Sequence, residues 1–412
     1  MINAGPAEGT TTIITGNPDG FPEREEGIRP RPQAYTTGGT GDDGADPLTE
    51  LCAEIEPVSD AAMTYFYGHL FAIEPQARAM FPPAMDAQRA CFWQALTRLV
   101  TQRHNAGQLA AYLDGLGRAH RKFGVRKEHF DAVRQALTAT WQRYAPRAWT
   151  DAAAAAWDEL FSQVAGLMIA AAERDAEQAP PWWLAEIIGH EARGADLAVL
   201  TLQPSQPVPY VPGQHLSVQT PHWPRLWRNY SIANAPREDG TLTIHVRAVS
   251  GGLVSAALVH HVAAGDTLLL GAPAGSMTAD TTSQRDILCL AGGTGLAPVK
   301  AIIEAVITSP AAGRRREIVL YYGARRASGL YDLPALQRME TAYPWLQVIP
   351  VVSEEAAPEA IYGTIPRVVA VAGWKNRDIY VSGPDEMIAR TVAELTARGA
   401  PADLIRYDCP LF

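Results

Sequence analysis

The spacing of the apolar residues changes at Pro180-Pro181, where a helical pattern gives way to a strand-like one, and this change restricts the folds that the chain can adopt. From Pro47 to about Arg174 the apolar residues recur with helical spacing, and no strand-like alternation interrupts them. Proline ends a helix because it lacks a backbone N–H and clashes with the preceding turn. Beyond the two prolines come short alternating runs, and then alternating strands and helices. The sequence therefore predicts a multidomain protein with an all-α domain, an antiparallel β-barrel domain and an α/β domain that contains a parallel sheet.

The length of the chain agrees with several domains, since 412 residues exceed what one ordinary core can hold. We place the helical domain at residues 46–178, the barrel at 179–282 and the α/β domain at 283–412. Residues 1–45 are rich in Gly, Thr, Pro and Asp, and they bury too little apolar surface to offset the chain entropy lost on folding. We expect this segment to be a disordered tail.

The charge of the chain limits its partners. The net charge of -9 and the lack of a basic patch argue against nucleic acid or an anionic membrane face. No apolar run is long enough to cross a bilayer, and the start lacks the layout of a signal peptide. The four cysteines are far apart, which favours reduced thiols over a disulfide framework or a zinc cluster. We expect a cytoplasmic protein; nothing in the sequence specifies its oligomeric state.

A histidine stands in the apolar stripe of the helical domain. Leu109, Leu113, Leu116 and His120 share one helical face. A single histidine on such a face is more often a core residue than a metal ligand, because ligation needs further partners. Three other residues of the domain favour the metal-ligand interpretation. Tyr67 and Phe81 come earlier in the domain, Gln88 opens the next helix, and His120 follows one helix after Gln88.

The order and spacing of these four residues resemble those of a globin of the bacterial flavohaemoglobin type. The resemblance implies that His120 is the proximal ligand of haem iron and that Phe81 packs flat on the porphyrin. It also implies that Tyr67 and Gln88 are the catalytic distal pair, which donates hydrogen bonds to bound dioxygen. The chemistry agrees with these roles, since a neutral imidazole is a good iron ligand and a phenol and an amide both supply donors.

Two positions depart from this family. In flavohaemoglobins a tyrosine ten residues after the proximal histidine and a glutamate in the last globin helix hydrogen-bond that histidine. Here the first position is Phe130, and the second falls near Arg174, with Glu173 beside it. The polar partners of a ligating histidine tune its basicity, so we expect a weaker electron push on the iron.

The barrel domain carries Arg228-Asn229-Tyr230-Ser231 and, further on, a Gly251-Gly252 pair. An aromatic ring, a cation and a hydroxyl on one strand suit a flat ring with a pyrophosphate tail, and small residues let backbone amides approach phosphates. These motifs resemble the flavin-binding barrel of the ferredoxin reductase superfamily. The resemblance implies that Tyr230 stacks on the flavin, Ser231 reaches its reactive nitrogen and Arg228 pairs with the pyrophosphate. The residues so assigned to FAD are Arg228, Asn229, Tyr230, Ser231, Gln214, Gly251, Gly252 and Ser255.

The α/β domain contains a glycine-rich turn between a strand and a helix, at residues 291–298. Such a turn lets backbone amides and the helix dipole meet a pyrophosphate. With Ser382-Gly383-Pro384 after a later strand, it resembles the nicotinamide-nucleotide half of the same superfamily. Arg325 and Arg326 suit a 2'-phosphate, but they suit a solvated surface equally well, so NADPH is not favoured over NADH. The residues so assigned to NAD(P)H are Gly292, Gly293, Thr294, Gly295, Arg325, Ser382, Gly383 and Pro384.

The C-terminus matches this superfamily only in part. In relatives the aromatic residue after a cysteine lies by the flavin, whereas here Pro410 follows Cys409 and the sequence ends at Phe412. Either Phe412 covers the flavin, or the flavin is less shielded from water.

The three sets of motifs occur in flavohaemoglobin order, which implies haem b with its iron, FAD and NAD(P)H as cofactors. The leading hypothesis is a nitric oxide dioxygenase, in which NAD(P)H reduces FAD, FAD reduces haem iron, and nitric oxide and dioxygen give nitrate. The expected partners are therefore small molecules: dioxygen, nitric oxide and NAD(P)H. Two alternatives stay open: a haem-flavin oxidoreductase with another donor or acceptor, and an oxygen-binding or sensing globin kept ferrous by its own reductase.

Overall fold

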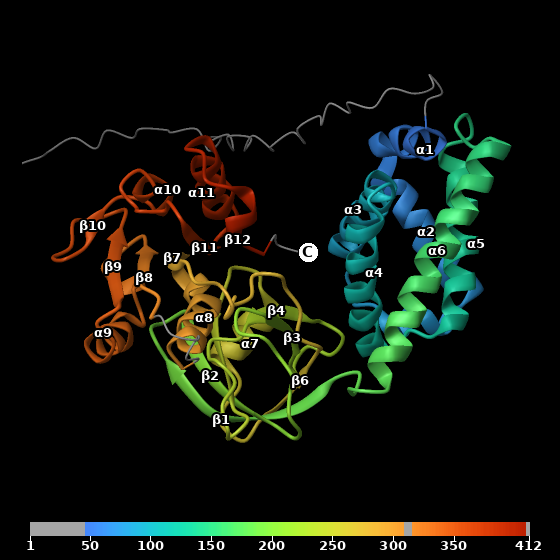
Figure 1. The fold of residues 1–412 in the computed structure, drawn as a ribbon. Coiled ribbons are helices and arrows are strands. Elements are labelled where there is room, and N and C mark those ends of the chain that lie inside the picture. The colour runs from blue at the N-terminus through green and yellow to red at the C-terminus, as the bar shows by residue number, and fades with distance from the viewer. Residues whose placement is uncertain (1–45, 309–314, 409–412) are drawn as a thin grey trace, which may run out of the picture. The chain divides into compact units, whose positions relative to one another are not determined.

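The computed structural model describes residues 46–308 and 315–408. The tail predicted at residues 1–45 lies outside the described residues, as do Pro410 and Phe412. Along the chain, the ribbon passes from helices to a barrel and then to a parallel sheet, following the colour bar from blue to red (Figure 1). The fold class predicted from the sequence is confirmed.

The first part of the described chain is all-helical. Its elements are α1 (Pro47–Ile55), η1 (Glu56–Val58), α2 (Ser59–Ile73), η2 (Pro75–Met80), α3 (Asp86–Gln102), α4 (Ala106–His120), η3 (Arg121–Phe123), α5 (Lys127–Tyr144) and α6 (Asp151–Ala176). Polar caps begin several helices: the side chains of Asp46 and Asn105 accept hydrogen bonds from the N–H groups of Thr49 and Gln108, at 2.7 and 3.2 Å. The helical spacing seen in the sequence thus corresponds to helices with defined starts.

The core of the helical part uses the apolar stripes that the sequence showed. Leu109 and Leu113 of α4 are fully buried, as is Trp157 of α6. The helices α4 and α6 pack closely at Gly117, where an added Cβ would lie 2.3 Å from the carbonyl oxygen of Met168. Gly117 therefore lets α6 pass close to α4 one turn before His120.

The second part is an antiparallel, nearly closed barrel of six strands in the order β4-β3-β6-β1-β2-β5. Its elements are β1 (Trp183–Ala192), β2 (Leu197–Pro204), β3 (His215–Gln219), β4 (Arg228–Ser231), β5 (Leu242–Arg247), α7 (Leu253–His260) and β6 (Thr267–Leu270). A bridge between Ile232 and Ile244 joins the two ends of this order. Leu242, Ile244 and Val246 point into the barrel and are buried, as their alternation predicts.

The third part is a parallel sheet of six strands in the order β10-β9-β8-β7-β11-β12. Its strands are β7 (Asp286–Gly292), β8 (Ile318–Ala324), β9 (Leu346–Val352), β10 (Ile361–Tyr362), β11 (Arg377–Ser382) and β12 (Ile405–Arg406). Its helices are η4 (Gly293–Gly295), α8 (Leu296–Thr308), η5 (Ala327–Gly329), α9 (Leu333–Ala342), α10 (Ile365–Val368), α11 (Asp385–Ala397) and η6 (Ala402–Leu404).

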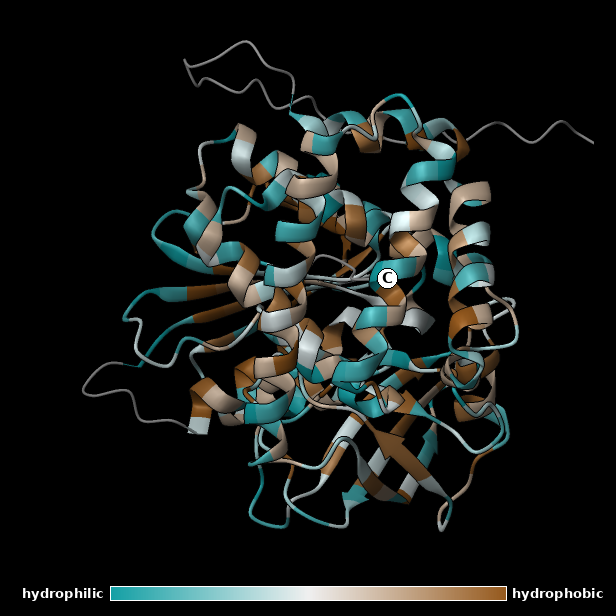
Figure 2. Cartoon of the chain, turned by 90° about the vertical axis from the view of Figure 1, so that its right-hand side faces the viewer, coloured by the Kyte–Doolittle hydropathy of each residue, from teal (hydrophilic) through white to brown (hydrophobic). Residues whose placement is uncertain are grey.

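Helices cover both faces of this sheet, because successive strand residues point to opposite sides. Ile287 and Cys289 of β7 pack with α8 and α9 on one side, whereas Leu288 and Leu290 pack with α10 and α11 on the other. In Figure 2 the sheet strands are accordingly brown, while the loops that join them are mostly teal.

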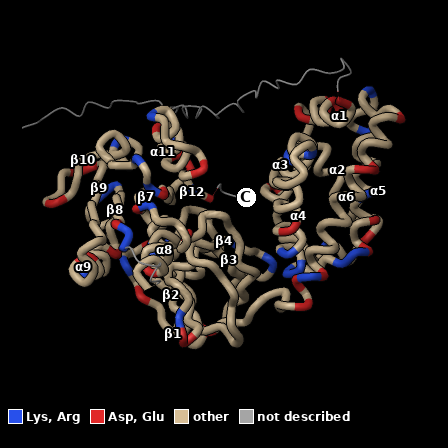
Figure 3. Tube along the Cα trace, viewed as in Figure 1, with Lys and Arg blue, Asp and Glu red and all other residues tan. Residues whose placement is uncertain are grey.

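The next features are the distribution of charged residues and the hydropathy of the helices. Lys and Arg (blue) and Asp and Glu (red) are interspersed along the described tube (Figure 3). Among the described helices, none is both long enough and apolar enough to cross a membrane.

Candidate functional site

The predicted distal residues come from three consecutive elements. Tyr67 lies on α2, Phe81 directly follows η2, and Gln88 lies in the first turns of α3. The Tyr67 ring lies 5.3 Å from the Phe81 ring and is also in contact with Phe71 and Phe92. The structure therefore brings Tyr67 and Phe81 together in one aromatic cluster.

Burial raises the pKa of the Tyr67 phenol, and a hydrogen bond with Gln88 acts in the opposite direction without cancelling the rise. The phenol therefore remains protonated at neutral pH and keeps a proton to donate. Tyr67 and Gln88 thus form a donor pair within an apolar surrounding, where hydrogen bonds are stronger than in water.

His120 is the last residue of α4. Its Nδ1 lies 2.7 Å from the carbonyl oxygen of Leu116, one turn earlier. The carbonyl can only accept, so Nδ1 donates and the other ring nitrogen, Nε2, keeps its lone pair for a metal. Burial lowers the pKa of this imidazole, which favours the neutral form that binds metals.

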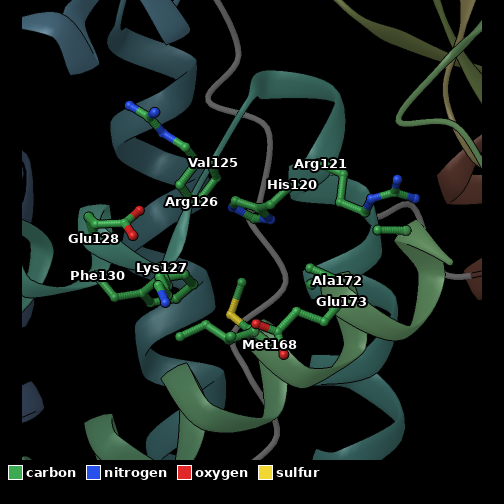
Figure 4. A pocket seen from close by; sticks show the side chains of 13 residues that line it. His120, Arg121, Val125, Arg126, Lys127, Glu128, Phe130, Met168, Ala172 and Glu173 are labelled. Carbon is green, nitrogen blue, oxygen red and sulfur yellow. The ribbon is translucent and has the colours of Figure 1, made fainter.

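A cavity of about 370 Å³ lies beside His120, between α4, α5 and α6. Figure 4 shows His120 on one side of this cavity, with the side chains of Met168 and Glu173 on the other. Phe130 also lines it. The lining is mixed: Met168 and Phe130 are apolar, whereas Arg121, Arg126, Lys127, Glu128 and Glu173 are charged.

The glutamate position of the family needs a correction. Arg174, to which the sequence spacing pointed, turns outward and forms an ion pair with Asp114 at 2.9 Å. The residue of α6 that faces His120 and Phe130 is instead Glu173. The sequence placed the two residues side by side, and the structure decides between them.

These residues fit a haem. A haem iron needs one protein ligand, which His120 can supply, and the aromatic cluster around Tyr67 and Phe81 suits a flat apolar macrocycle. Neither Tyr67 nor Phe81 is among the residues that line the cavity beside His120. In the part of the chain that the structure describes, no group of three His, Cys, Asp or Glu side chains could hold a metal ion by itself. His120 thus remains the predicted metal ligand.

The predicted flavin residues Arg228, Asn229, Tyr230 and Ser231 form the whole of strand β4. The strand pairs with β3, with Tyr230 opposite Leu216 and Ser231 opposite His215. Arg228 and Asn229 are exposed, whereas Tyr230 and Ser231 are half-buried. The strand therefore presents a cation to solvent at one end and a partly covered aromatic ring at the other.

The second predicted flavin motif precedes α7. Gly251 has a φ of 73°, a conformation that favours glycine, and Gly252 is the N-cap of the helix. The Ser255 hydroxyl donates to the Gly252 carbonyl at 3.1 Å and accepts from the Val249 N–H at 3.3 Å. A Cβ on Gly252 would meet Ser255 Oγ at 2.5 Å, so only glycine leaves this loop intact.

Gln214, the remaining predicted flavin residue, has an internal partner. Its Oε1 accepts a hydrogen bond from the Val211 N–H at 2.9 Å and so holds the turn before β3. The turn lies next to His215, the partner of Ser231 in the sheet.

The two predicted nucleotide turns lie against each other. The strands β7 and β11 are parallel neighbours, so Gly292–Gly295 and Ser382–Pro384 lie at the same edge of the sheet. An added Cβ on Gly295 would lie 2.5 Å from the backbone of Ser382 and Gly383. This edge, at the carboxyl ends of the strands, is where open α/β sheets bind nucleotides. Thr294, the remaining residue of the first turn, lies in η4 between Gly293 and Gly295.

Arg325 and Arg326 follow β8 at this same edge and are largely exposed. Both lie near Glu354, at 3.9 and 3.4 Å respectively. Both arginines are thus solvent-exposed cations that share one carboxylate neighbour.

The comparisons with known proteins match each folded part to a family. Residues 64–168 match the Globin family, residues 185–278 the oxidoreductase FAD-binding domain and residues 289–393 the oxidoreductase NAD-binding domain. A flavohemoprotein from Rhizobium meliloti is 26% identical over 380 residues, which is 84% of this chain and 92% of the relative. By domain composition and order, the chain is a flavohaemoglobin.

One further relative matches about half of the chain, and one solved structure matches most of it. The electron transfer component of a xylene/toluene monooxygenase from Pseudomonas putida is 30% identical over 52% of the chain, which spans 61% of that relative's length. Among solved structures, a flavohemoglobin from Malassezia yamatoensis with bound FAD and heme has a TM-score of 0.73 at 18% identity, covering 87% of this chain and 98% of that one. At 18% identity, the similarity to the Malassezia yamatoensis structure shows a shared fold and nothing further.

The three domains define the cofactors and the class of reaction. This flavohaemoglobin takes haem, FAD and a nicotinamide nucleotide, and it is an NAD(P)H-dependent oxidoreductase.

Sequence reasoning missed Asp408, close to the C-terminus of this flavohaemoglobin. Its Oδ1 accepts hydrogen bonds from the N–H groups of Ser276 and Met277 at 2.7 and 3.0 Å, and its Oδ2 lies 3.6 Å from Nδ1 of His215. Burial raises the pKa of this carboxyl, but these donors outweigh it and hold the pKa below its usual value. Asp408 therefore ties the chain end to the barrel as an anion. Phe412, the predicted flavin cover, lies outside the described residues.

Proposed function

We propose that this flavohaemoglobin is a nitric oxide dioxygenase, which uses NAD(P)H and dioxygen to convert nitric oxide to nitrate. The observation that carries the proposal is that buried Tyr67 is hydrogen-bonded to half-buried Gln88, in the same helical domain as His120. In this reaction the haem iron supplies the site at which dioxygen and nitric oxide react, and the flavin supplies its electrons one at a time.

The distal residues would orient and stabilise oxygen ligands. A protonated phenol at Tyr67 and an amide at Gln88 can donate hydrogen bonds to an oxygen that gains negative charge. The rings of Phe66, Phe81 and Phe92 around Tyr67 exclude water and so strengthen these bonds.

The other two domains would deliver electrons. The facing turns at Gly295 and Gly383 offer backbone amides to the pyrophosphate of a nicotinamide nucleotide. The β4 strand would hold the flavin, with the Tyr230 ring against the isoalloxazine and Arg228 on the pyrophosphate. The balance closes, since the two electrons of one NADH convert two nitric oxide and two dioxygen molecules into two nitrates.

We place this reaction in the cytoplasm. Cys52, Cys91 and Cys289 are free thiols, which suits a reducing compartment. The small molecules of the reaction would be the main partners of the chain.

The test is nitric oxide consumption by the purified protein with NADH in air. We expect nitrate to form in proportion to NADH oxidised, and Tyr67→Phe, which removes one donor while keeping the ring, to slow it by about a hundredfold. Nitrate formation no faster than that of a haem-free preparation would refute the proposal.

One observation favours a second function, an oxygen-binding globin or an oxidoreductase with another acceptor. The Nδ1 of His120 donates to a backbone carbonyl, and Phe130, which lines the same cavity, has no hydroxyl to offer the imidazole. A neutral carbonyl makes the imidazole less basic than a carboxylate would. A stable oxygenated spectrum with slow turnover in the presence of nitric oxide would favour this second function.

A further inference from the structure

A short helical turn, η3, begins directly after His120 and ends at Gly124, whose φ of 74° favours glycine. This turn carries Lys122 and Phe123. Because η3 continues α4 without a break, the His120 ring and these two side chains keep a fixed spacing. Arg121 of the same turn forms an ion pair with Asp175 of α6 and donates to the carbonyl of Ala179 at 2.9 Å, which holds the turn in place.

Two ring contacts lead from His120 to the strand predicted to bind the flavin. The centroid of the Phe123 ring lies 6.1 Å from that of His120, with an angle of 73° between the rings. The same ring lies 6.4 Å from the ring of Trp227, at 85°. Both are edge-to-face contacts, which aromatic rings favour. Trp227 directly precedes Arg228, the first residue of β4.

Lys122 joins the same two parts of the chain. Its Nζ lies 5.1 Å from the ring centroids of both Phe123 and Trp227, and it donates to the Ser217 hydroxyl at 2.7 Å. Ser217 lies on β3, opposite Asn229 of β4. Among the described residues no carboxylate pairs with Lys122, so two aromatic faces and one hydroxyl hold this cation.

Gly271 makes room for this arrangement. An added Cβ would lie 2.2 Å from Ser217 Oγ and 3.2 Å from Lys122 Cδ. The Gly271 N–H also donates to the Ser217 carbonyl at 2.7 Å, which fixes the serine in the barrel wall. The barrel thus has a built recess for the lysine stem.

We propose that Lys122, Phe123 and Trp227 form a bridge that holds the haem-ligand end of α4 against the flavin strand and so sets the rate of electron transfer from flavin to haem. The three are positioning residues, since they act through His120 and β4. The proposal rests on the haem and flavin roles given above, but it does not depend on nitric oxide as the substrate.

The electron balance of the step is closed. NADH would give a hydride, and hence two electrons, to the flavin. One electron would reduce the single ferric haem iron of the chain, the second would stay on the flavin until that iron is oxidised again, and the protons would go to solvent. Electron transfer between buried groups falls steeply with distance. A bridge that fixes the spacing therefore controls this step and leaves hydride transfer to the flavin unchanged.

The test follows anaerobic reduction of the full-length holoprotein by NADH, with the flavin and haem absorption bands recorded separately after rapid mixing. Trp227→Leu, Phe123→Leu and Lys122→Met each remove one member of the bridge. Trp227→Phe keeps a ring at the position, and Trp223→Leu, in the same segment before β4, is the matched control.

We expect haem reduction to slow by about tenfold to a hundredfold in the three bridge variants, as a misplacement of about 1 Å can cause. Flavin reduction, haem content and flavin content should stay as in the parent protein. Trp227→Phe should recover most of the lost rate, and Trp223→Leu should match the parent. The double variant of Phe123 and Trp227 should be no slower than the slower single variant, because one bridge is broken only once.

A second readout does not depend on turnover. Hydrogen exchange in the oxidised holoprotein should rise at residues 121–124 and 227–231 together in each bridge variant, and at neither in Trp223→Leu.

Haem reduction within about twofold of the parent in Lys122→Met and Phe123→Leu, with both cofactors bound, would overturn the proposal. Because this assay contains no nitric oxide, its result can be interpreted even if the protein does not convert nitric oxide to nitrate.

Discussion

His120 shows how one residue depends on its immediate neighbours. Its Nδ1 donates to the Leu116 carbonyl, burial keeps the ring neutral, and the cavity at its side is lined by Phe130 and Glu173. The ring is therefore oriented by the helix itself.

Replacing His120 with Ala should remove haem from the protein while FAD remains. Removing a residue that hydrogen-bonds a metal ligand typically lowers metal affinity by about 10–100-fold, and removing the ligand itself should lower it more. The absorption spectrum of the purified variant measures this directly, and added imidazole should restore part of the haem band. His104→Ala, at an exposed position, is the control; full haem in His120→Ala would show that another residue is the ligand.

At the scale of elements, the packing of α4 against α6 determines where His120 lies. The helices meet at Gly117, because a larger residue would collide with the Met168 backbone. Two residues earlier, Gly115 has no atom within 4 Å of an added Cβ. The same helix therefore offers a glycine that is required by packing and one that is not.

Gly117→Ala and Gly115→Ala should have opposite effects on stability. Overpacking at Gly117 should lower the free energy of unfolding by about 1–3 kcal/mol and reduce haem binding. Alanine at Gly115 should raise it by about 0.5–1 kcal/mol, since glycine loses more chain entropy in a helix. Denaturant unfolding followed by helical circular dichroism compares the two; equal effects would mean that the α4–α6 contact is looser than described.

At the scale of the whole molecule, a buried polar contact joins the barrel to the parallel-sheet part. Nδ1 of His245, on β5, lies 2.7 Å from the Tyr331 hydroxyl. His245 points away from the barrel interior, yet only 4% of it is exposed, because Tyr331 covers that face. Burial lowers the pKa of His245 to about 3, with the charge of Lys300 acting in the same direction and that of Asp332 opposing it.

This histidine should make stability depend on pH. Its folded pKa is depressed, so the unfolded chain takes up the proton first as the pH falls from about 6.5. The stabilisation is fully present above about pH 6.5 and is lost progressively towards the folded pKa of about 3. We expect the denaturation midpoint of the parent protein to fall more steeply over this range than that of His245→Gln. Parallel curves for the two proteins would contradict this assignment.

Much of the cofactor framework could be predicted from the sequence because it depends on local order. Helical spacing up to Pro180, alternation in residues 242–248 and a glycine-rich turn after a buried strand are set by neighbours in the chain. The positions of β4 and of the turns at Gly295 and Gly383 follow from these patterns, since parallel strands place their ends at one edge.

Only the tertiary structure decided the contacts between segments that are far apart in the sequence. Which of the neighbours Glu173 and Arg174 lines the cavity beside His120 depends on how α6 is rotated against α4, and spacing in the sequence does not reveal this rotation. That Lys122 and Phe123 reach Ser217 and Trp227 depends on how η3 meets the barrel, across about a hundred residues of chain. Local patterns determine which elements form and which cofactors they suit, whereas the packing of those elements decides which side chains meet.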